Sequence, residues 1–220
     1  MTIEANNTAV TGIPRIGDRA PDFTATTTKG DITFSEWQGA SWVVLFSHPA
    51  DFTPVCTTEL AEFARRQSEF AARNTKLIGL SIDSIHSHLA WLRNINERLD
   101  VQIDYPLIAD LNTAVAQKYG MIHPGASATA TVRAVFVIDP QHTIRALIYY
   151  PLTNGRNIDE ILRLVDSLQA SDSYKVATPV NWRPGDKVIV PAPRTEAQIE
   201  SNLKAGDEVV DFYLVKKSLN

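Results

Sequence analysis

The single cysteine of the chain, Cys56, is the side chain best suited to nucleophilic or redox chemistry. A continuous apolar run at residues 42–48 precedes it and predicts a strand buried on both faces. Thr53 and Pro54 then signal a helix start, because threonine is a good N-cap and proline suits the first helical position. In that register Cys56 is the third helical residue, where free N–H groups and the helix dipole favour an anionic sulfur. Since the thiolate is the nucleophilic form, the pattern predicts a reactive cysteine beyond the carboxyl end of the strand.

A lone cysteine is more often a small buried hydrophobic residue, and that alternative stands beside the reactive one. The proline-containing loop at a helix start favours reactivity, since core positions are rarely placed there. One cysteine also excludes an internal disulfide, a zinc finger of the four-cysteine kind and a two-cysteine redox cycle within one chain. We therefore expect a reducing compartment, namely the cytoplasm.

Arg133 is the second unusual side chain, because it falls within an apolar run at residues 132–138. Both faces of this run are apolar, which predicts a central strand with the arginine near its beginning. A buried guanidinium that is not paired and hydrogen-bonded is strongly destabilising. One interpretation is an ion pair with a structural carboxylate. The other is a cation held beside an anionic nucleophile or a substrate oxygen.

The elements around these residues alternate between strands and helices. Apolar runs predict strands at 42–48 and 77–82, and helical spacing predicts helices at 60–71, 86–99, 112–119 and 158–168. Strands at 132–138 and 143–150 flank a turn at 139–142, a hairpin signal. The pattern predicts an α/β fold: a three-layer domain with a mixed central sheet and right-handed crossovers.

Apolar periodicity stops around residues 171–173, which suggests a boundary. We expect an N-terminal extension at 1–15, a main domain at 16–172 and a small C-terminal extension at 173–220. The extension is expected to consist of strands and loops, with a strand at 187–190. The first twelve residues lack a basic segment followed by an apolar one, so no secretory signal is expected.

Composition excludes several classes of protein. An apolar share of 44% and a charged share of 21% argue against wholesale disorder, and a net charge of −4 argues against nucleic-acid binding. No apolar run approaches the roughly 20 residues that span a bilayer, so no membrane association is expected. His86 and His88 are two residues apart, which separates them on a helix, so no metal site is expected. No glycine-rich phosphate loop is present, and no cofactor is expected.

The residues around Cys56 resemble the active-site pattern of the peroxiredoxins. The match is Pro49-x-x-x-Thr53-x-x-Cys56, and Arg133 stands where the second catalytic arginine of that family is expected. The sequence is most similar to the 1-Cys subgroup, over about residues 16–190. Further similar segments are 47–49, 56–59, 80–83, 88–91, 135–138, 150–151, 155–157 and 176–182.

The resemblance implies a thioredoxin-like fold and an antioxidant thiol-dependent peroxidase. Cys56 would reduce hydrogen peroxide and organic hydroperoxides through a sulfenic acid, which an external thiol or an ascorbate-type reductant would reduce. Thr53 would orient the peroxide, Pro49 would shield the site from water and Arg133 would stabilise the charge.

The resemblance also adds Glu59 and Arg156 as partners that orient the arginines, and His48 as a pocket neighbour. For His48 a purely structural role is an equal alternative. The resemblance further implies a homodimer in which residues 176–190 pack across subunits. The proline-rich loops of that region hold few apolar residues, so we expect another surface to bury Val180, Trp182 and Val188.

One departure from the subgroup concerns phospholipase activity. The Gly-x-Ser-x-Gly element of some members corresponds here to residues 39–43, where Val43 replaces the last glycine, and Ser35 stands near the position of the histidine. Phospholipase activity is therefore not expected.

Two other functions compete with the peroxidase. A peroxide sensor or a holdase would need Cys56 but no turnover, and a disulfide-exchanging thiol transferase would usually carry a Cys-x-x-Cys pair that is missing here.

Overall fold

The computed structural model describes residues 12–219, so the N-terminal extension expected at residues 1–15 lies mostly outside the described residues. The chain divides into two compact units, one that ends at Arg156 and one from Asn157 onward. Each unit has its own sheet. The first unit carries the residues that the sequence singles out for chemistry.

The first unit is built on a mixed seven-stranded sheet in the order β2-β1-β5-β4-β3-β6-β7. Strands β3, β4 and β5 are parallel, while β6 is antiparallel to both of its neighbours, β3 and β7. All residues of β3 and β6 are buried, which agrees with their continuous apolar sequences. The strands are β1 (Thr24–Thr27), β2 (Gly30–Thr33), β3 (Trp42–Ser47), β4 (Thr75–Ser81), β5 (Leu107–Ala109), β6 (Arg133–Ile138) and β7 (Ile144–Tyr150).

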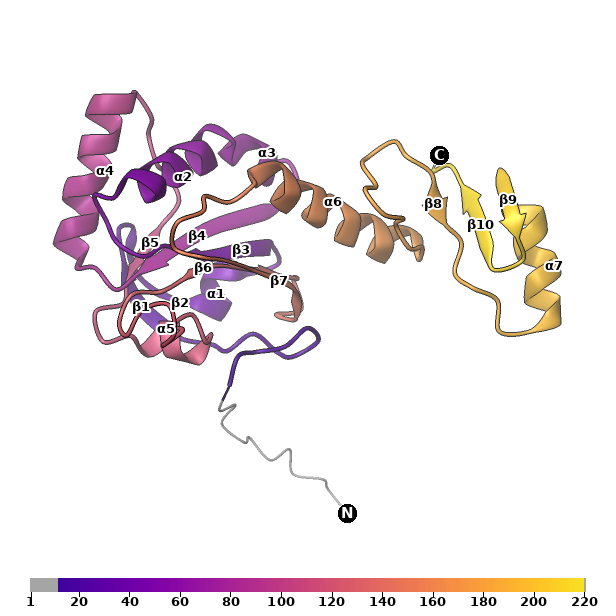
Figure 1. Ribbon diagram of the computed structural model, residues 1–220, viewed down its shortest axis with the longest axis horizontal. Helices are drawn as coiled ribbons and strands as arrows, with labels where there is room; N and C mark the ends of the chain where they lie inside the picture. Colours follow the sequence, from indigo (N-terminus) through magenta and orange to yellow (C-terminus); the bar gives the residue numbers. More distant parts are fainter. Residues whose placement is uncertain (1–11, 220) are drawn as a thin grey trace, which may run out of the picture. The chain divides into compact units, whose positions relative to one another are not determined.

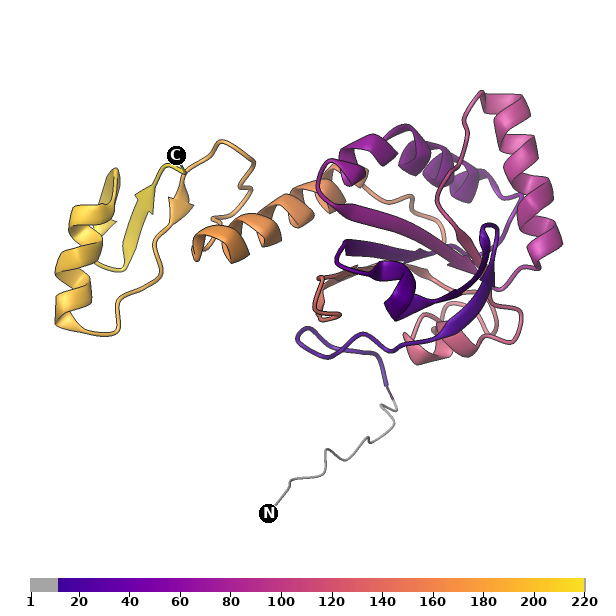
Figure 2. The ribbon, with the colours of Figure 1, turned by 180° about the vertical axis from the view of Figure 1, so that it is seen from behind.

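Helices cover both faces of this sheet, which confirms the three-layer α/β fold (Figure 1). Helices α2, α3 and α4 lie over one face, and the short α1 and α5 lie over the other; the reverse view agrees (Figure 2). The helices are α1 (Phe34–Gln38), α2 (Pro54–Arg65), α3 (Gln67–Ala71), α4 (Ile85–Leu99) and α5 (Ala114–Lys118).

Aromatic rings fill the core on both faces of the sheet. Under α2, Phe46 of β3 stacks on Phe63 with ring centroids 4.2 Å apart. On the opposite face, Phe136 of β6 meets Tyr119 edge to face at 5.1 Å. The stack of Phe46 on Phe63 holds α2 against β3, one of the two strands that border the site.

The predicted helix at residues 60–71 is two helices in the structure. Arg66 separates α2 from α3, with φ −103° and ψ 9°, outside the helical region. Across the break, the ring centroids of Phe63 in α2 and Phe70 in α3 lie 6.0 Å apart. The apolar spacing continues through the break, which is why it suggested one helix.

The second unit contains α6 (Ile158–Tyr174), β8 (Val188–Ile189), α7 (Glu196–Ala205), β9 (Glu208–Asp211) and β10 (Leu214–Lys217). The three strands pair in the order β8-β10-β9. The prediction of strands and loops alone is wrong, because it omits α7. Also wrong is the expectation that Trp182 and Val188 need another surface, because both are buried within this unit, beside Val176. Val180 stays 88% exposed.

None of the helices within residues 12–219 is long and apolar enough to cross a membrane.

Candidate active site

Cys56 lies in the first turn of α2, directly after the loop that follows β3. The helix starts at Pro54 with Thr53 as its N-cap, so Cys56 is its third residue, as predicted. The cysteine is completely buried. Its sulfur therefore lies near the positive end of the helix dipole, in a place from which water is largely excluded.

Thr53 has the extended backbone of an N-cap, but its side chain does not cap the helix. Its hydroxyl donates instead to the carbonyl of Ala50, at 2.8 Å. The hydroxyl hydrogen is thereby occupied, and the oxygen lone pairs remain available. Pro49, half-buried, precedes this turn.

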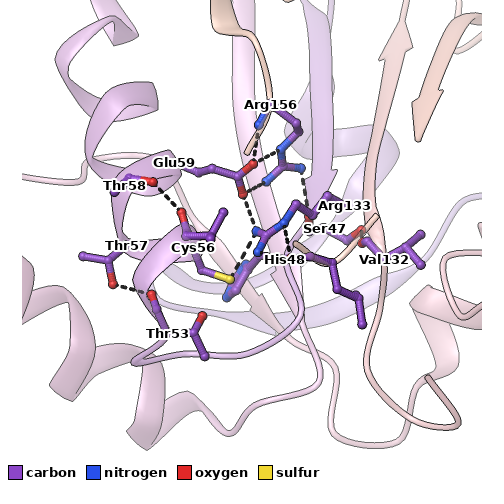
Figure 3. Close-up of polar contacts among 12 residues, drawn as sticks. Ser47, His48, Thr53, Cys56, Thr57, Thr58, Glu59, Val132, Arg133 and Arg156 are labelled. Carbon is purple, nitrogen blue, oxygen red and sulfur yellow. Dashed lines mark hydrogen bonds and ion pairs between the residues drawn. The ribbon is translucent and has the colours of Figure 1, made fainter. Parts of the chain in front are cut away.

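Arg133, the first residue of β6, lies against the sulfur (Figure 3). Its Nη1 is 3.3 Å from Sγ of Cys56 and 2.7 Å from Oε2 of Glu59. Nε and Nη2 of the same guanidinium both donate to the carbonyl of Leu152, at 3.1 and 2.7 Å. These contacts fix the guanidinium in one orientation, with one nitrogen directed at the sulfur.

Arg156 holds the other side of the Glu59 carboxylate. Its Nε donates to Oε1 at 2.9 Å and its Nη2 to Oε2 at 2.6 Å, a bidentate pair. Its Nη1 donates to the carbonyls of Ser47 and Ala134, and its guanidinium lies 5.0 Å from the ring centroid of Phe46. Arg156 is therefore a buried support for Glu59, which in turn positions Arg133.

Ser47, the last residue of β3, connects this strand to the start of β6 through two hydrogen bonds. Its hydroxyl donates to the carbonyl of Val132 at 2.6 Å and accepts from the backbone N–H of Ala134 at 3.1 Å. These two partners flank Arg133 in the sequence. Serine at a strand end is a common residue, so the sequence alone gave no signal for this role.

The charges of this buried group do not cancel. Arg133 and Arg156 bring two positive charges and Glu59 brings one negative charge, and all three side chains are at most 3% exposed. The remaining positive charge lies beside Sγ of Cys56. This charge can stabilise negative charge at the sulfur or on an atom bound beside it.

His48 is buried at the end of β3, and it contacts a second buried group. Its Nε2 lies 3.0 Å from Oδ1 of Asp51, whose Oδ2 is 2.8 Å from Nδ1 of His88. The carbonyl of His48 accepts from the hydroxyl of Thr131 at 2.8 Å. Nδ1 of His48 is buried and has no hydrogen-bond partner.

Sequence reasoning missed Asp51 and set His88 aside. The sequence places His88 beside His86, whereas α4 brings it to Asp51, in a loop 37 residues earlier. His48, Asp51 and His88 offer ligand atoms within 4.8 Å of one another, a set that could hold a metal ion. The hydrogen bonds from His48 and His88 to Asp51 are sufficient to account for the closeness of the three side chains.

Ser41, the serine of the altered Gly-x-Ser-x-Gly element, and Ser35 both hydrogen-bond to polar side chains. Ser41 Oγ donates to Oδ1 of Asn74 at 3.1 Å, and Ser35 Oγ donates to Oδ2 of Asp22 at 2.7 Å. Neither partner is a histidine that could activate the serine, so these contacts do not support an esterase site.

Comparisons with known proteins agree with this geometry. Residues 16–147 match the AhpC/TSA family, and residues 167–205 match the C-terminal domain of 1-Cys peroxiredoxin. A peroxiredoxin of Aquifex aeolicus is 52% identical over 220 residues, which cover 96% of this chain and 99% of the relative. Peroxiredoxin 2 of Picrophilus torridus is 53% identical over 193 residues, 88% of this chain and 94% of the relative.

Solved structures give the same result. A yeast mitochondrial 1-Cys peroxiredoxin, studied for thiol resolution through glutathione and thioredoxin systems, aligns with a TM-score of 0.86 and 44% identity over 94% of this chain and all of that one. A mutant of peroxiredoxin 6 of Arenicola marina aligns with a TM-score of 0.85 and 38% identity, over 94% of this chain and 98% of that one.

The chain belongs to the AhpC/TSA family of peroxiredoxins, in the 1-Cys subgroup. Its fold is the thioredoxin-like fold of that family, followed by a C-terminal extension. It is a thiol-dependent peroxidase with a single buried cysteine.

Proposed function

We propose that Cys56 reduces hydrogen peroxide and organic hydroperoxides, with Arg133 as its catalytic partner. The thiolate attacks the terminal peroxide oxygen, an S–O bond forms and the O–O bond breaks. The released alkoxide or hydroxide takes a proton and leaves as an alcohol or water, and Cys56 is left as the sulfenic acid. The 3.3 Å contact between Nη1 of Arg133 and Sγ carries this proposal.

The other residues prepare the site for this step. Since the Thr53 hydroxyl donates to Ala50, its lone pairs can accept the O–H of a hydroperoxide and direct the terminal oxygen toward the sulfur. Pro49 shields the site from bulk water, and His48 borders the pocket. Glu59 and Arg156 hold Arg133 in place through the contacts described above.

An external reductant completes the cycle, because the chain contains no second cysteine to form an internal disulfide. A low-molecular-weight thiol, a thiol protein or an ascorbate-type reductant has the required two electrons. The glutathione and thioredoxin systems named for the yeast relative belong to the thiol class.

Without a reductant, we expect peroxide consumption by the pure protein to stop at about one equivalent per chain, the capacity of one thiol for one two-electron oxidation. A peroxide electrode measures this, and added thiol should restart consumption. The Cys56→Ser variant, which keeps the size of the side chain, should consume none. Sustained consumption without a reductant would disprove the external step, and no restart with any thiol or ascorbate would favour a sensor.

We also propose a homodimer that uses the C-terminal unit. Trp182 and Val188 are buried within the unit, but other apolar side chains of the unit are exposed and available for a contact between two chains: Val180 (88%), Val210 (62%) and Tyr213 (58%). Sedimentation at micromolar concentration should show a dimer that a Val180→Asp, Tyr213→Asp double variant weakens. A monomer in both proteins would contradict this proposal.

We also propose a peroxidase domain at residues 16–172 and an extension at 173–220, a functional division that assigns nearly all of α6 to the peroxidase domain although the second compact unit starts at Asn157. On the basis of the single cysteine we propose a cytoplasmic location.

A further inference from the structure

Asp51 is a buried carboxylate shared by two buried imidazoles. Nε2 of His48 lies 3.0 Å from Oδ1, and Nδ1 of His88 lies 3.1 Å from Oδ1 and 2.8 Å from Oδ2. The side chains of both histidines are fully buried, and that of Asp51 is 1% exposed. A group of this kind needs every proton to be placed between a donor and an acceptor.

The proton positions follow from which atoms can accept. Hydrogen bonds from His48 and His88 outweigh the effect of burial and hold the pKa of Asp51 well below its ordinary value, so the carboxylate only accepts. Both imidazole nitrogens that face it are therefore donors. Nε2 of His88 faces the carbonyl of Ile108 at 3.1 Å, which is also an acceptor. His88 thus donates from both nitrogens, and the resulting imidazolium balances the charge of Asp51.

The protonation state of His48 differs from that of His88. Burial lowers its pKa, and the hydrogen bond to Asp51 only partly offsets this effect, while the charge of Arg156 adds to the lowering. The ring is neutral, with its one proton on Nε2. Nδ1 is then a buried lone pair with no partner, on a residue that Figure 3 draws within the Cys56 site.

We propose that His88 is a positioning residue of the peroxidase: acting through Asp51, it fixes His48 as the Nε2–H tautomer and so keeps Nδ1 as a second acceptor, which shares the O–H of a bound hydroperoxide with the hydroxyl oxygen of Thr53. The inference rests on the proposed function. A hydroperoxide held there is bound by the oxygen that carries hydrogen, the terminal oxygen that Cys56 attacks. The opposite tautomer would present an N–H, which cannot accept that hydrogen.

The tautomer itself can be measured without any peroxide. In the full-length protein, imidazole ¹⁵N NMR should show His48 protonated at Nε2, with the signals assigned by their loss in His48→Gln. In Asp51→Ala no acceptor faces Nε2 of His48, so the tautomer is no longer fixed and protonation at Nδ1 should become detectable. A chelator should leave both spectra unchanged, since hydrogen bonds hold the group. The same tautomer in both proteins, or a spectrum that changes with chelator, would overturn the proposal.

Two variants of His88 separate positioning from packing. Asparagine places its amide nitrogen near the position of Nδ1 and keeps the donor to Asp51, whereas glutamine places it near Nε2 and keeps only the donor to Ile108. We expect His88→Asn to retain the rate of Cys56 oxidation within about threefold, and His88→Gln and Asp51→Ala to lose about tenfold, or 1.4 kcal/mol of barrier.

A role in packing alone would instead lower both His88 variants in parallel with their melting temperatures, and that result would refute the positioning role. If wild-type Cys56 is not oxidised by peroxide at all, the proposed function fails, while the NMR measurement still decides the tautomer.

Discussion

Replacing Arg133 by lysine should slow the oxidation of Cys56 by peroxide at least about tenfold, equivalent to some 1.4 kcal/mol of barrier, while the fold is retained. The lysine keeps the positive charge. A cation about 4 Å from the sulfur is worth about 4 kcal/mol at an effective dielectric near 20, before desolvation is deducted, and the helix start adds about 0.3–1 kcal/mol. If charge alone mattered, the variant would therefore stay active.

A lysine cannot reproduce the fixed orientation of the Arg133 guanidinium. The guanidinium uses Nε and Nη2 on the carbonyl of Leu152 so that Nη1 can meet both Sγ and Glu59. One ammonium nitrogen on a flexible stem cannot make these contacts together, nor hold a peroxide oxygen beside the sulfur.

Stopped-flow oxidation under limiting peroxide measures the effect directly. The matched control is Arg145→Lys in the neighbouring strand β7, where the arginine pairs with Asp139 at 3.2 Å, and it should oxidise at the wild-type rate. A near-native rate for Arg133→Lys would show that orientation by this residue is unimportant.

Replacing Glu59 by glutamine should lower the free energy of unfolding by about 3–5 kcal/mol, the usual cost of breaking a buried ion pair. Glutamine fills the same space, but it removes the carboxylate charge that pairs with both buried guanidiniums. It also gives Arg156 an amide in place of a carboxylate that accepts three of its N–H groups, at 2.6–2.9 Å. Oxidation of Cys56 should slow as well, since Arg133 loses its support.

The control for this variant lies one turn away on the same helix. Glu62 pairs with Arg65 at 3.8 Å, and both side chains are about half exposed. Pairs of this kind contribute about 0–1 kcal/mol, so Glu62→Gln should unfold in urea almost as the wild type does. Equal losses in the two variants would mean that the buried charge balance does not stabilise the fold.

The fold was predictable where burial leaves a simple trace in the sequence. Strands β3 and β6 are buried throughout and are therefore continuously apolar, and the turn at 139–142 marks the β6–β7 hairpin. Helix α7 has no buried residue and so no apolar stripe to detect. It does carry a local signal, because Thr195 accepts from the N–H of Gln198 in a capping pattern that the sequence contains.

The site was predictable to the extent that single residues were conspicuous. Cys56 and Arg133 stood out by type and position, and the structure brings them together. Glu59 and Arg156 came only from family resemblance, since a Glu on a helix and an Arg in a loop look like surface residues. Asp51 and His88 could not be paired, because the rotation and placement of α4 over the sheet decide that contact.

Because Cys56 is completely buried, the peroxide and the reductant need different amounts of space to reach its sulfur. A hydroperoxide brings only two oxygen atoms to the sulfur, whereas a thiol reductant brings a sulfur on a bulky molecule. We expect the sulfenic acid to reach that reductant through opening of the first turn of α2, the segment that carries it. If so, turnover at saturating peroxide and reductant is expected to follow how often this turn opens, and reductants of different size should reach the same maximum rate.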